Sequence, residues 1–173
     1  MQVADVTAEW LKTIEYKMVS TFNGPTIEGV KLRRLNPIVD GRGDLIELWS
    51  EPWEGFEPPK HVYQSATDYG VIKGWHLHAE HSDQMTVTRG KVQVVAVDIR
   101  PNSQTFGQVN SFILSTATPG LLRIEPGILH GWKALSRPEI RVVNVQTHVY
   151  DPGDEFKFPW DTVLETVWEP KNG

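Results

Sequence analysis

The chain has 173 residues, a formal net charge of −5 and no cysteine, with 39% hydrophobic and 23% charged residues. The lack of cysteine excludes disulfides, a thiolate nucleophile and a cysteine-based zinc site, and the negative charge disfavours broad binding to nucleic acid or anionic membranes. This length and composition predict one globular domain over residues 1–173, large enough to enclose a sizeable core.

The N-terminal segment predicts a short helix, because apolar side chains recur at helical spacing: Val6, Trp10, Leu11, Ile14 and Met18. Glycine, proline and asparagine in residues 22–30 end this helix. The segment lacks the basic start and apolar stretch of a signal peptide, and no apolar run in the chain approaches the roughly 20 residues that span a bilayer. We therefore expect a cytoplasmic protein with no membrane segment.

From residue 27 onward the pattern changes to short runs of β-forming residues separated by turns. These runs lie at residues 29–35, 44–50, 60–66, 70–78, 84–90, 91–99, 111–115, 120–126, 130–136 and 140–150. Short strands at this spacing, with a single helix, predict an all-β fold, a β-sandwich or barrel whose core spans about residues 27–161. The end of the chain, from residue 158, predicts a last short helix or turn.

Histidines gather in one part of the chain: three of the six lie within residues 76–81, and His130 follows a Pro-Gly pair. Alternate side chains of a strand share a face, which places His76 and His78 together. The opposite face of the same strand is expected to hold Lys73, Trp75 and Leu77. A single histidine is more often a hydrogen-bonded group without chemistry, but this pair with a third histidine favours a functional site.

The last long run shows the same alternation. One of its faces is apolar or β-branched and is predicted to pack. The other face carries polar groups and is formed by Val142, Asn144, Gln146, His148 and Tyr150. A small barrel with polar side chains inside usually encloses a ligand cavity. We therefore expect one cavity lined by His76, His78, His130, Asn144 and His148.

Two patterns resemble the motifs of the cupin superfamily: the H-x-H pair, and a G-x5-PG-x2-H pattern from Gly120 to His130. Within the cupins, four segments resemble the dTDP-4-dehydrorhamnose 3,5-epimerase family: residues 40–47, 70–76, 87–108 and 124–136. Residues 147–161 are similar to a stretch near that family's C-terminus. The resemblance covers the chain from about residue 30 to residue 161.

This resemblance implies a cupin jelly roll, commonly a homodimer, that acts on a nucleotide-linked 4-keto-6-deoxy sugar such as a dTDP-hexose, with no cofactor and no metal. A ketone at C4 acidifies the neighbouring hydrogens, so a base removes one proton and an acid on the other face of the sugar returns another. In the family pattern His76 matches the base, and Lys73 matches the positive group that supports the enolate. Arg42 and Glu47 match the residues that bind the nucleotide, expected at the mouth of the cavity, and His130 matches the histidine of the second motif.

Three departures from the family pattern bear on the chemistry. Asp83 stands near the family's lysine that follows the base strand, which reverses the sign of the charge. Asn144 stands at the family's proton-donating tyrosine and cannot serve as a general acid. The family's aspartate partner of the base lies in a C-terminal segment with no counterpart in this sequence. Tyr63 and Tyr150 are the candidates for a replacement acid, and both join the predicted substrate-binding residues.

Three alternatives stay open beside the epimerase. The nucleotide-sugar 3,4-ketoisomerases share two short features with this chain, Gly74-x-His76-x-His78 and Val62-Tyr63. A metal-dependent cupin would bind Fe, Mn, Ni or Zn through His76, His78, Gln84 and His130. A homologue that binds sugar nucleotides without turning them over would explain the missing acid.

Overall fold

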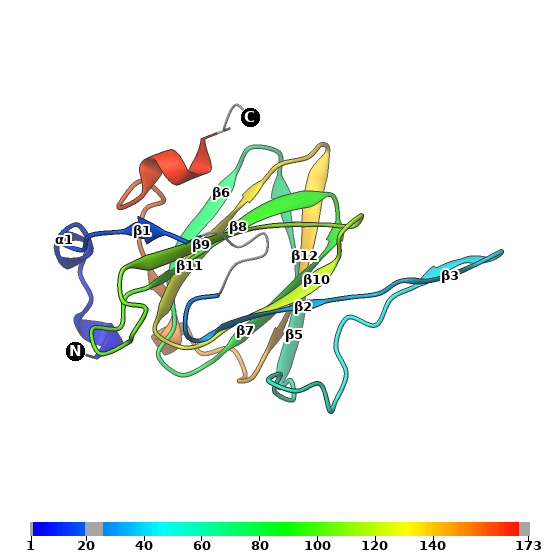
Figure 1. Cartoon of the computed structure of the whole chain (residues 1–173), viewed down its shortest axis with the longest axis horizontal. Helices are drawn as coiled ribbons and strands as arrows, with labels where there is room; N and C mark the ends of the chain where they lie inside the picture. The colour runs from blue at the N-terminus through cyan, green and yellow to red at the C-terminus, as the bar shows by residue number, and fades with distance from the viewer. Residues whose placement is uncertain (1, 20–25, 170–173) are drawn as a thin grey trace.

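Two β-sheets pack face to face in the computed structural model, which describes residues 2–19 and 26–169 (Figure 1). The six-stranded sheet has the order β1–β9–β8–β11–β6–β13, formed by Lys17–Met18, Gln108–Ser115, Lys91–Asp98, Ile128–Ala134, Ile72–Leu77 and Phe156–Lys157. The five-stranded sheet has the order β2–β10–β7–β12–β5, formed by Val30–Arg34, Gly120–Ile124, Asp83–Arg89, Glu139–Gln146 and His61–Asp68. This arrangement confirms the predicted all-β sandwich.

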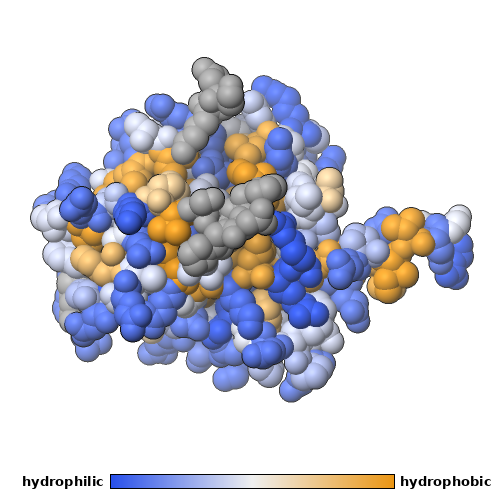
Figure 2. Space-filling model, in the orientation of Figure 1, coloured by the Kyte–Doolittle hydropathy of each residue, from blue (hydrophilic) through white to orange (hydrophobic). Residues whose placement is uncertain are grey.

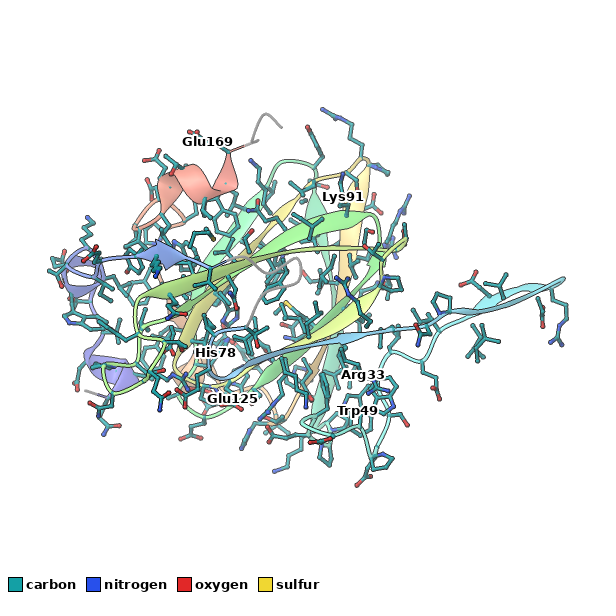
Figure 3. All side chains as sticks on the ribbon, in the orientation of Figure 1. Arg33, Trp49, His78, Lys91, Glu125 and Glu169 are labelled. Carbon is teal, nitrogen blue, oxygen red and sulfur yellow. The ribbon has the colours of Figure 1, made fainter. Side chains whose placement is uncertain are left out.

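The strand alternation divides the apolar residues into two cores. In β8, Val94 and Ala96 face the five-stranded sheet and meet Met85 and Val87 of β7, and side chains from both sheets fill the space between them (Figure 3). The intervening side chains of the six-stranded sheet, among them Val95, Val97, Trp75 and Leu77, belong to a second core on its outer face. Because both of its faces are covered, β8 is buried along most of its length.

The two ends of the chain cover that outer face. The N-terminal segment contributes Leu11 and Ile14, and the C-terminal segment contributes Val163, Val167 and Trp168. The predicted N-terminal helix is present but shorter than its apolar pattern: a 3-10 turn at Val3–Asp5 precedes α1, which spans only Ala8–Leu11. Its N-cap is Thr7, whose hydroxyl accepts a hydrogen bond from the backbone of Trp10. Met18 lies instead in β1, which pairs in parallel with β9.

The predicted last short helix is also present, as a 3-10 turn at Glu165–Trp168, and another 3-10 turn spans Pro152–Asp154. In residues 2–19 and 26–169, no helix is long and apolar enough to cross a membrane.

A two-stranded arm extends away from the sandwich (Figure 1). Its strands are β3, Ile38–Asp40, and β4, Gly43–Leu45, so the run predicted at residues 44–50 forms a strand only at its start. Apolar side chains are exposed along the arm (Figure 2): Ile38 is 66% exposed, Val39 74% and Leu45 59%. The arm buries little of its apolar surface against its own chain, unlike the strands of the two sheets.

Candidate active site

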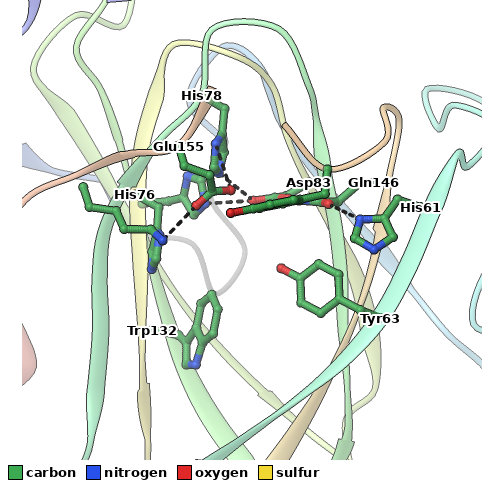
Figure 4. Close-up of a pocket in the computed structure, with 11 residues that line it drawn as sticks. His61, Tyr63, His76, His78, Asp83, Trp132, Gln146 and Glu155 are labelled. Carbon is green, nitrogen blue, oxygen red and sulfur yellow. Dashed lines mark hydrogen bonds and ion pairs between the residues drawn. The ribbon is translucent and has the colours of Figure 1, made fainter. Parts of the chain in front are cut away.

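A cavity of about 310 Å³ opens between the two sheets (Figure 4), within the size range of small-molecule sites. Strands of both sheets supply its walls, together with the segment that follows β12. Its lining residues are His61, Tyr63, His76, His78, Asp83, His130, Trp132, Gln146, Tyr150, Glu155 and Lys157. Polar and aromatic side chains therefore replace the aliphatic packing found elsewhere between the sheets.

His76 and His130 lie side by side because β6 and β11 pair with these two residues in register. Their ring centroids are 6.0 Å apart, and the ring of His76 stacks on Trp132 at 5.7 Å. The strands approach closely at Gly74, where an added Cβ would lie 3.1 Å from the Cα of Gly131. The histidines of the two motifs, which are far apart in the sequence, thus meet in one cavity. Their separation is smaller than the span of one sugar ring with its contacts.

Lys73 does not follow the predicted alternation. The pairing of β6 with β11 shifts by one residue between His76 and Lys73, so Lys73 faces the five-stranded sheet rather than sharing a face with Trp75. Its ammonium donates to the hydroxyl of Ser65 at 2.8 Å and to the backbone carbonyl of Ala66 at 2.9 Å. These contacts hold Lys73 on β5, and it is not among the residues that line the cavity.

Asp83 is the centre of the polar network, although it is only 3% exposed. Its Oδ1 accepts hydrogen bonds from the amides of Asn144, at 2.7 Å, and Gln146, at 3.0 Å. Its Oδ2 lies 2.9 Å from Nε2 of His130 and 3.5 Å from Nε2 of His78. Burial opposes the charge of this carboxylate, but the hydrogen bonds of the surrounding histidines outweigh burial and hold the pKa of Asp83 well below its usual range.

The histidines of the cavity differ in their affinity for a proton. Burial lowers the pKa of His76 to about 3, and the nearby His130 and His78 add to this effect. Burial also opposes the charge of His78, but its hydrogen bond to Asp83 and the charge of that carboxylate raise the pKa of His78. At neutral pH His76 is therefore an uncharged imidazole, the form in which a histidine can act as a base, and it binds a proton less tightly than a free imidazole does.

Tyr63 stands on the wall opposite His76 (Figure 4). Its hydroxyl accepts a hydrogen bond from the Asn144 amide at 3.1 Å, because the two residues are direct partners in the pairing of β5 with β12. Burial raises the pKa of Tyr63 to about 12, and the negative charge of Asp83 adds to this effect. The phenol therefore keeps its proton at neutral pH and can donate it to a ligand.

Of the other predicted residues, His78 and Tyr150 line the cavity, and Asn144 supports it from behind through Asp83 and Tyr63. His148 is an exposed residue beyond the end of β12, not a lining residue, and its ring contacts the hydroxyl of Thr147. β12 ends at Gln146, so the alternation that predicted the position of His148 stops there.

Arg42 and Glu47 do not lie at the mouth of their own chain's cavity. Arg42 sits on the exposed arm, paired with Asp40 at 2.6 Å, and Glu47 is exposed just beyond β4. Gln84 also points elsewhere: its amide donates to the backbone carbonyls of Glu57 and Val145. The structure therefore does not bring Gln84 into the cavity with His76, His78 and His130.

Sequence reasoning missed several cavity residues, of which Asp83 is the most central. The strand alternation contained the signal, since Asp83, Met85 and Val87 share one face of β7 and the latter two are core residues. Gln84 lies on the other face. Gln146 lies on the polar face predicted for the last long run, although it was not among the residues expected to line the cavity. The remaining missed residues come from separate strands and the last segment, with no common pattern in the sequence: His61, Trp132, Glu155 and Lys157.

Two groups of side chains in the described part of the chain bring metal-ligand atoms within 4.8 Å of one another. One consists of His78, Asp83 and His130, and the other of His78, His81 and Asp154. All of these residues are buried, and the first group borders the cavity.

The chain is similar to known sugar-nucleotide enzymes. The family model described as dTDP-4-dehydrorhamnose 3,5-epimerase matches residues 25–172. A probable low-salt glycan biosynthesis epimerase, Agl13 of Haloferax volcanii, is 32% identical over 141 residues, which cover 79% of this chain and 90% of the relative. A dTDP-4-dehydrorhamnose 3,5-epimerase of Methanothermobacter thermautotrophicus is 35% identical over 154 residues, covering 85% of this chain and 80% of the relative.

A solved structure has the same fold. The dTDP-6-deoxy-D-glucose-3,5-epimerase of Legionella pneumophila, in complex with dTDP-4-keto-L-rhamnose, superposes with a TM-score of 0.71 at 27% identity. The superposition covers 86% of this chain and 78% of that one.

Proposed function

Because the chain belongs to the dTDP-4-dehydrorhamnose 3,5-epimerase family, we propose that it epimerises a dTDP-linked 4-keto-6-deoxyhexose. The relatives support an epimerase activity, and the Legionella pneumophila enzyme was solved with a dTDP-4-keto sugar. One observation carries the proposal: a neutral imidazole, His76, and a protonated phenol, Tyr63, face each other across one cavity (Figure 4). Inversion at carbon needs such a pair, since the proton leaves one face and returns to the other.

His76 is the general base. It takes the proton from the carbon next to the C4 ketone, and the electron pair of the broken C–H bond moves into the ring to form an enolate with its charge on the C4 oxygen. Stacking on Trp132 fixes the plane of the imidazole, which supports a defined direction of attack. A positioned general base contributes about 10²- to 10⁴-fold to such a reaction.

Tyr63 is the general acid, and it returns a proton to the same carbon from the opposite face. The family pattern places its acid at position 144, where this chain has asparagine. Asn144 is the register partner of Tyr63 and donates a hydrogen bond to its hydroxyl. The phenol has thus moved to the neighbouring strand, and the amide of Asn144 orients it and stabilises the phenolate that forms when the proton is lost.

The working unit is a homodimer. The exposed apolar side chains of the arm, Ile38, Val39 and Leu45, favour contact with another protein surface. A second copy would cover them and would carry Arg42 and Glu47 of one chain toward the nucleotide end of the other chain's cavity. Light scattering should give twice the chain mass at micromolar concentration, and Val39→Asp should shift the protein toward monomer. A wild-type monomer at that concentration would contradict this part of the proposal.

The reaction is tested by incubating the protein with a dTDP-4-keto-6-deoxyhexose in D₂O and following C3 and C5 by NMR. Wild type should incorporate deuterium and invert at least one carbon. His76→Asn should lose both, whereas Tyr63→Phe should retain more exchange than inversion, because the base can still remove and return a proton on its own face. His148→Ala is the matched control and should behave as wild type.

The same experiment separates the alternatives. A new 3-keto product would identify a 3,4-ketoisomerase. Binding of dTDP without exchange at either carbon would identify a sugar-nucleotide-binding protein and would overturn the proposed activity.

A further inference from the structure

One cation of the cavity takes no part in the proposed proton transfer. Lys157, of β13, lines the cavity, and it is the only lysine or arginine among the lining residues in the described part of the chain. Its side chain is 60% exposed, so the ammonium lies on the open side of the cavity. We propose that Lys157 is the catalytic residue that stabilises the negative charge on the C4 oxygen of the substrate, an inference that rests on the proposed epimerisation.

The pairing of β13 with β6 places Lys157 beside the general base. Lys157 and His76 are direct partners in this antiparallel pair, so their side chains project from the same face. Side chains paired in this way have Cβ atoms about 4.5–5.5 Å apart. When the imidazole of His76 reaches a carbon next to the ketone, the longer side chain of Lys157 therefore reaches the C4 oxygen.

Backbone contacts fix the strand that carries Lys157. The amide of Phe158 donates to the carbonyl of Trp75 at 2.9 Å, and the amide of Trp75 donates to the carbonyl of Phe158 at 2.6 Å. Phe156 packs against the core on the outer face of the six-stranded sheet, so the alternation of the strand turns Glu155 and Lys157 toward the cavity. The position of Lys157 thus follows from strand pairing and alternation.

Glu155 holds the ammonium near the cavity without using all of its hydrogens. Its Oε2 lies 3.2 Å from Nζ of Lys157, and its Oε1 lies 3.9 Å from Nδ1 of His78 (Figure 4). The Glu155 side chain is only 16% exposed, so the partner that anchors the lysine is the more buried one. An ammonium carries three N–H donors, so it can donate to Glu155 and to a substrate oxygen at the same time.

The charge of Lys157 acts on both ends of the proton transfer. Burial is the main cause of the low pKa of His76, about 3, and the nearby charge of Lys157 adds to it. As the C–H bond breaks, its proton passes to His76 and its electron pair forms the C=C bond of the enolate, which leaves the negative charge on the C4 oxygen. The flexible stem of Lys157 lets the ammonium approach that oxygen to hydrogen-bond distance, closer than it lies to the imidazolium, so attraction outweighs repulsion.

The residue that the family pattern assigns to this task is held elsewhere. The ammonium of Lys73 donates to Ser65 and Ala66 of β5, and Lys73 is not a lining residue. Among the described residues, the cavity therefore receives its lysine from β13 and not from β6.

The test compares Lys157→Met, which removes the charge and keeps most of the length, with Lys157→Arg, which keeps the charge. On a dTDP-4-keto-6-deoxyhexose, Lys157→Met should lower kcat by about 10- to 100-fold. Loss of one donor to an oxyanion typically costs about 10²- to 10³-fold, and water screens this partly exposed cation. The kcat of Lys157→Arg should exceed that of Lys157→Met by at least about threefold, because the positive charge remains. Lys91→Met is the matched control, at an exposed lysine of β8 outside the cavity, and should behave as wild type.

Calorimetry with dTDP, which has no ketone, separates this role from binding of the diphosphate. Lys157→Met and Lys157→Arg should each bind dTDP within about threefold of wild type, because an interaction made only with the oxyanion changes kcat and not nucleotide binding.

A Lys157→Met protein that is folded by circular dichroism and keeps the wild-type kcat would overturn the role of Lys157 and leave the epimerase intact. A loss confined to KM and dTDP affinity would also overturn it, because the lysine would then bind the diphosphate. No deuterium exchange by wild type would overturn the proposed activity and this role together.

Discussion

Asp83 and Asp98 are both buried, with exposed fractions of 3% and 0%, but their surroundings differ in kind. Asp98, at the end of β8, receives two guanidinium hydrogen bonds from Arg100, at 2.9 and 2.8 Å. The hydroxyls of Ser103, at 2.5 Å, and Thr105, at 2.7 Å, also donate to it. Each of these donors carries its hydrogen at every pH at which the protein is folded, and the arginine is always charged.

Asp83 has permanent donors on one oxygen only. Its other oxygen faces the imidazoles of His78 and His130, whose Nε2 atoms donate a hydrogen bond only when they carry a proton. The partners of Asp98 are also local, two to seven residues away, whereas the amides that hold Asp83 lie 61 and 63 positions along the chain. A carboxylate whose hydrogen-bond donors come from its own turn contributes to stability. A carboxylate whose donors come from distant strands beside a cavity is available for chemistry.

The largest effect should be on turnover, and it should come from a substitution in the cavity that Asp83 borders. His76→Asn should lower turnover of a dTDP-4-keto sugar by about 10²- to 10⁴-fold, because the substituted amide cannot accept the proton. The unfolding free energy should change little, since Asn retains a polar side chain at a half-buried position. Steady-state kinetics and urea unfolding on the same preparation check both statements. A variant that keeps more than about a tenth of wild-type turnover would remove His76 from the base role.

Asp98→Asn should show the opposite pattern. Replacing the carboxylate weakens the charge-assisted bonds from Arg100, Ser103 and Thr105, so the unfolding free energy at pH 7 should fall by about 1.5–3 kcal/mol, the range for hydrogen bonds to charged groups. Turnover by the folded variant should remain near wild type, because Asp98 is not a cavity residue. Urea unfolding measures the first quantity and kinetics below the transition the second. A loss of turnover without a loss of stability would break the division between the two aspartates.

The effect of Asp98 should also depend on pH. Burial opposes its charge, but the hydrogen bonds from Arg100, Ser103 and Thr105 outweigh burial and lower the pKa of Asp98. A carboxyl whose pKa is lower in the folded state stabilises the fold fully above its unfolded pKa, about 3.9, and loses this contribution as the pH falls through the folded pKa. The stability difference between wild type and Asp98→Asn should therefore be constant from pH 7 to about 5 and shrink below about pH 4. Urea midpoints at a series of pH values test it, and a difference that grows on acidification would have the wrong sign.

The same two regions show what the sequence could predict. Strand alternation identified the sandwich and the common face of His76 and His78, because these follow from side chains within one strand. It failed at Lys73, where one extra residue in β6 shifts the register against β11. No local sequence pattern predicts such a shift, since it depends on the partner strand β11, more than fifty residues away in the sequence.

The family motifs match position 83 to a lysine and Gln84 to a ligand, whereas the alternation of β7 puts Asp83 in the cavity. Arg42 and Glu47 matched the family by sequence, yet their position depends on the arm, whose direction no residue pattern specifies. Local periodicity was thus sufficient for faces, and long-range pairing was needed for the site.

The smallest effect should come from an ion pair whose arginine is exposed to solvent and whose carboxylate, Glu139, is partly buried. Glu139 pairs with Arg89 at 2.7 Å, and the arginine side chain is 48% exposed. Exposed pairs of this kind contribute about 0–1 kcal/mol, because water screens the attraction and two long side chains must be ordered. Arg89→Gln should therefore lower the unfolding free energy by less than about 1 kcal/mol, and 1 M NaCl should remove most of the difference, since the screening length falls to about 3 Å. The Asp98→Asn difference should survive the same salt, because that carboxylate is shielded from solvent. Parallel urea unfolding of the two variants at low and high salt measures this contrast, and an equal salt response would show that burial does not separate the two carboxylates.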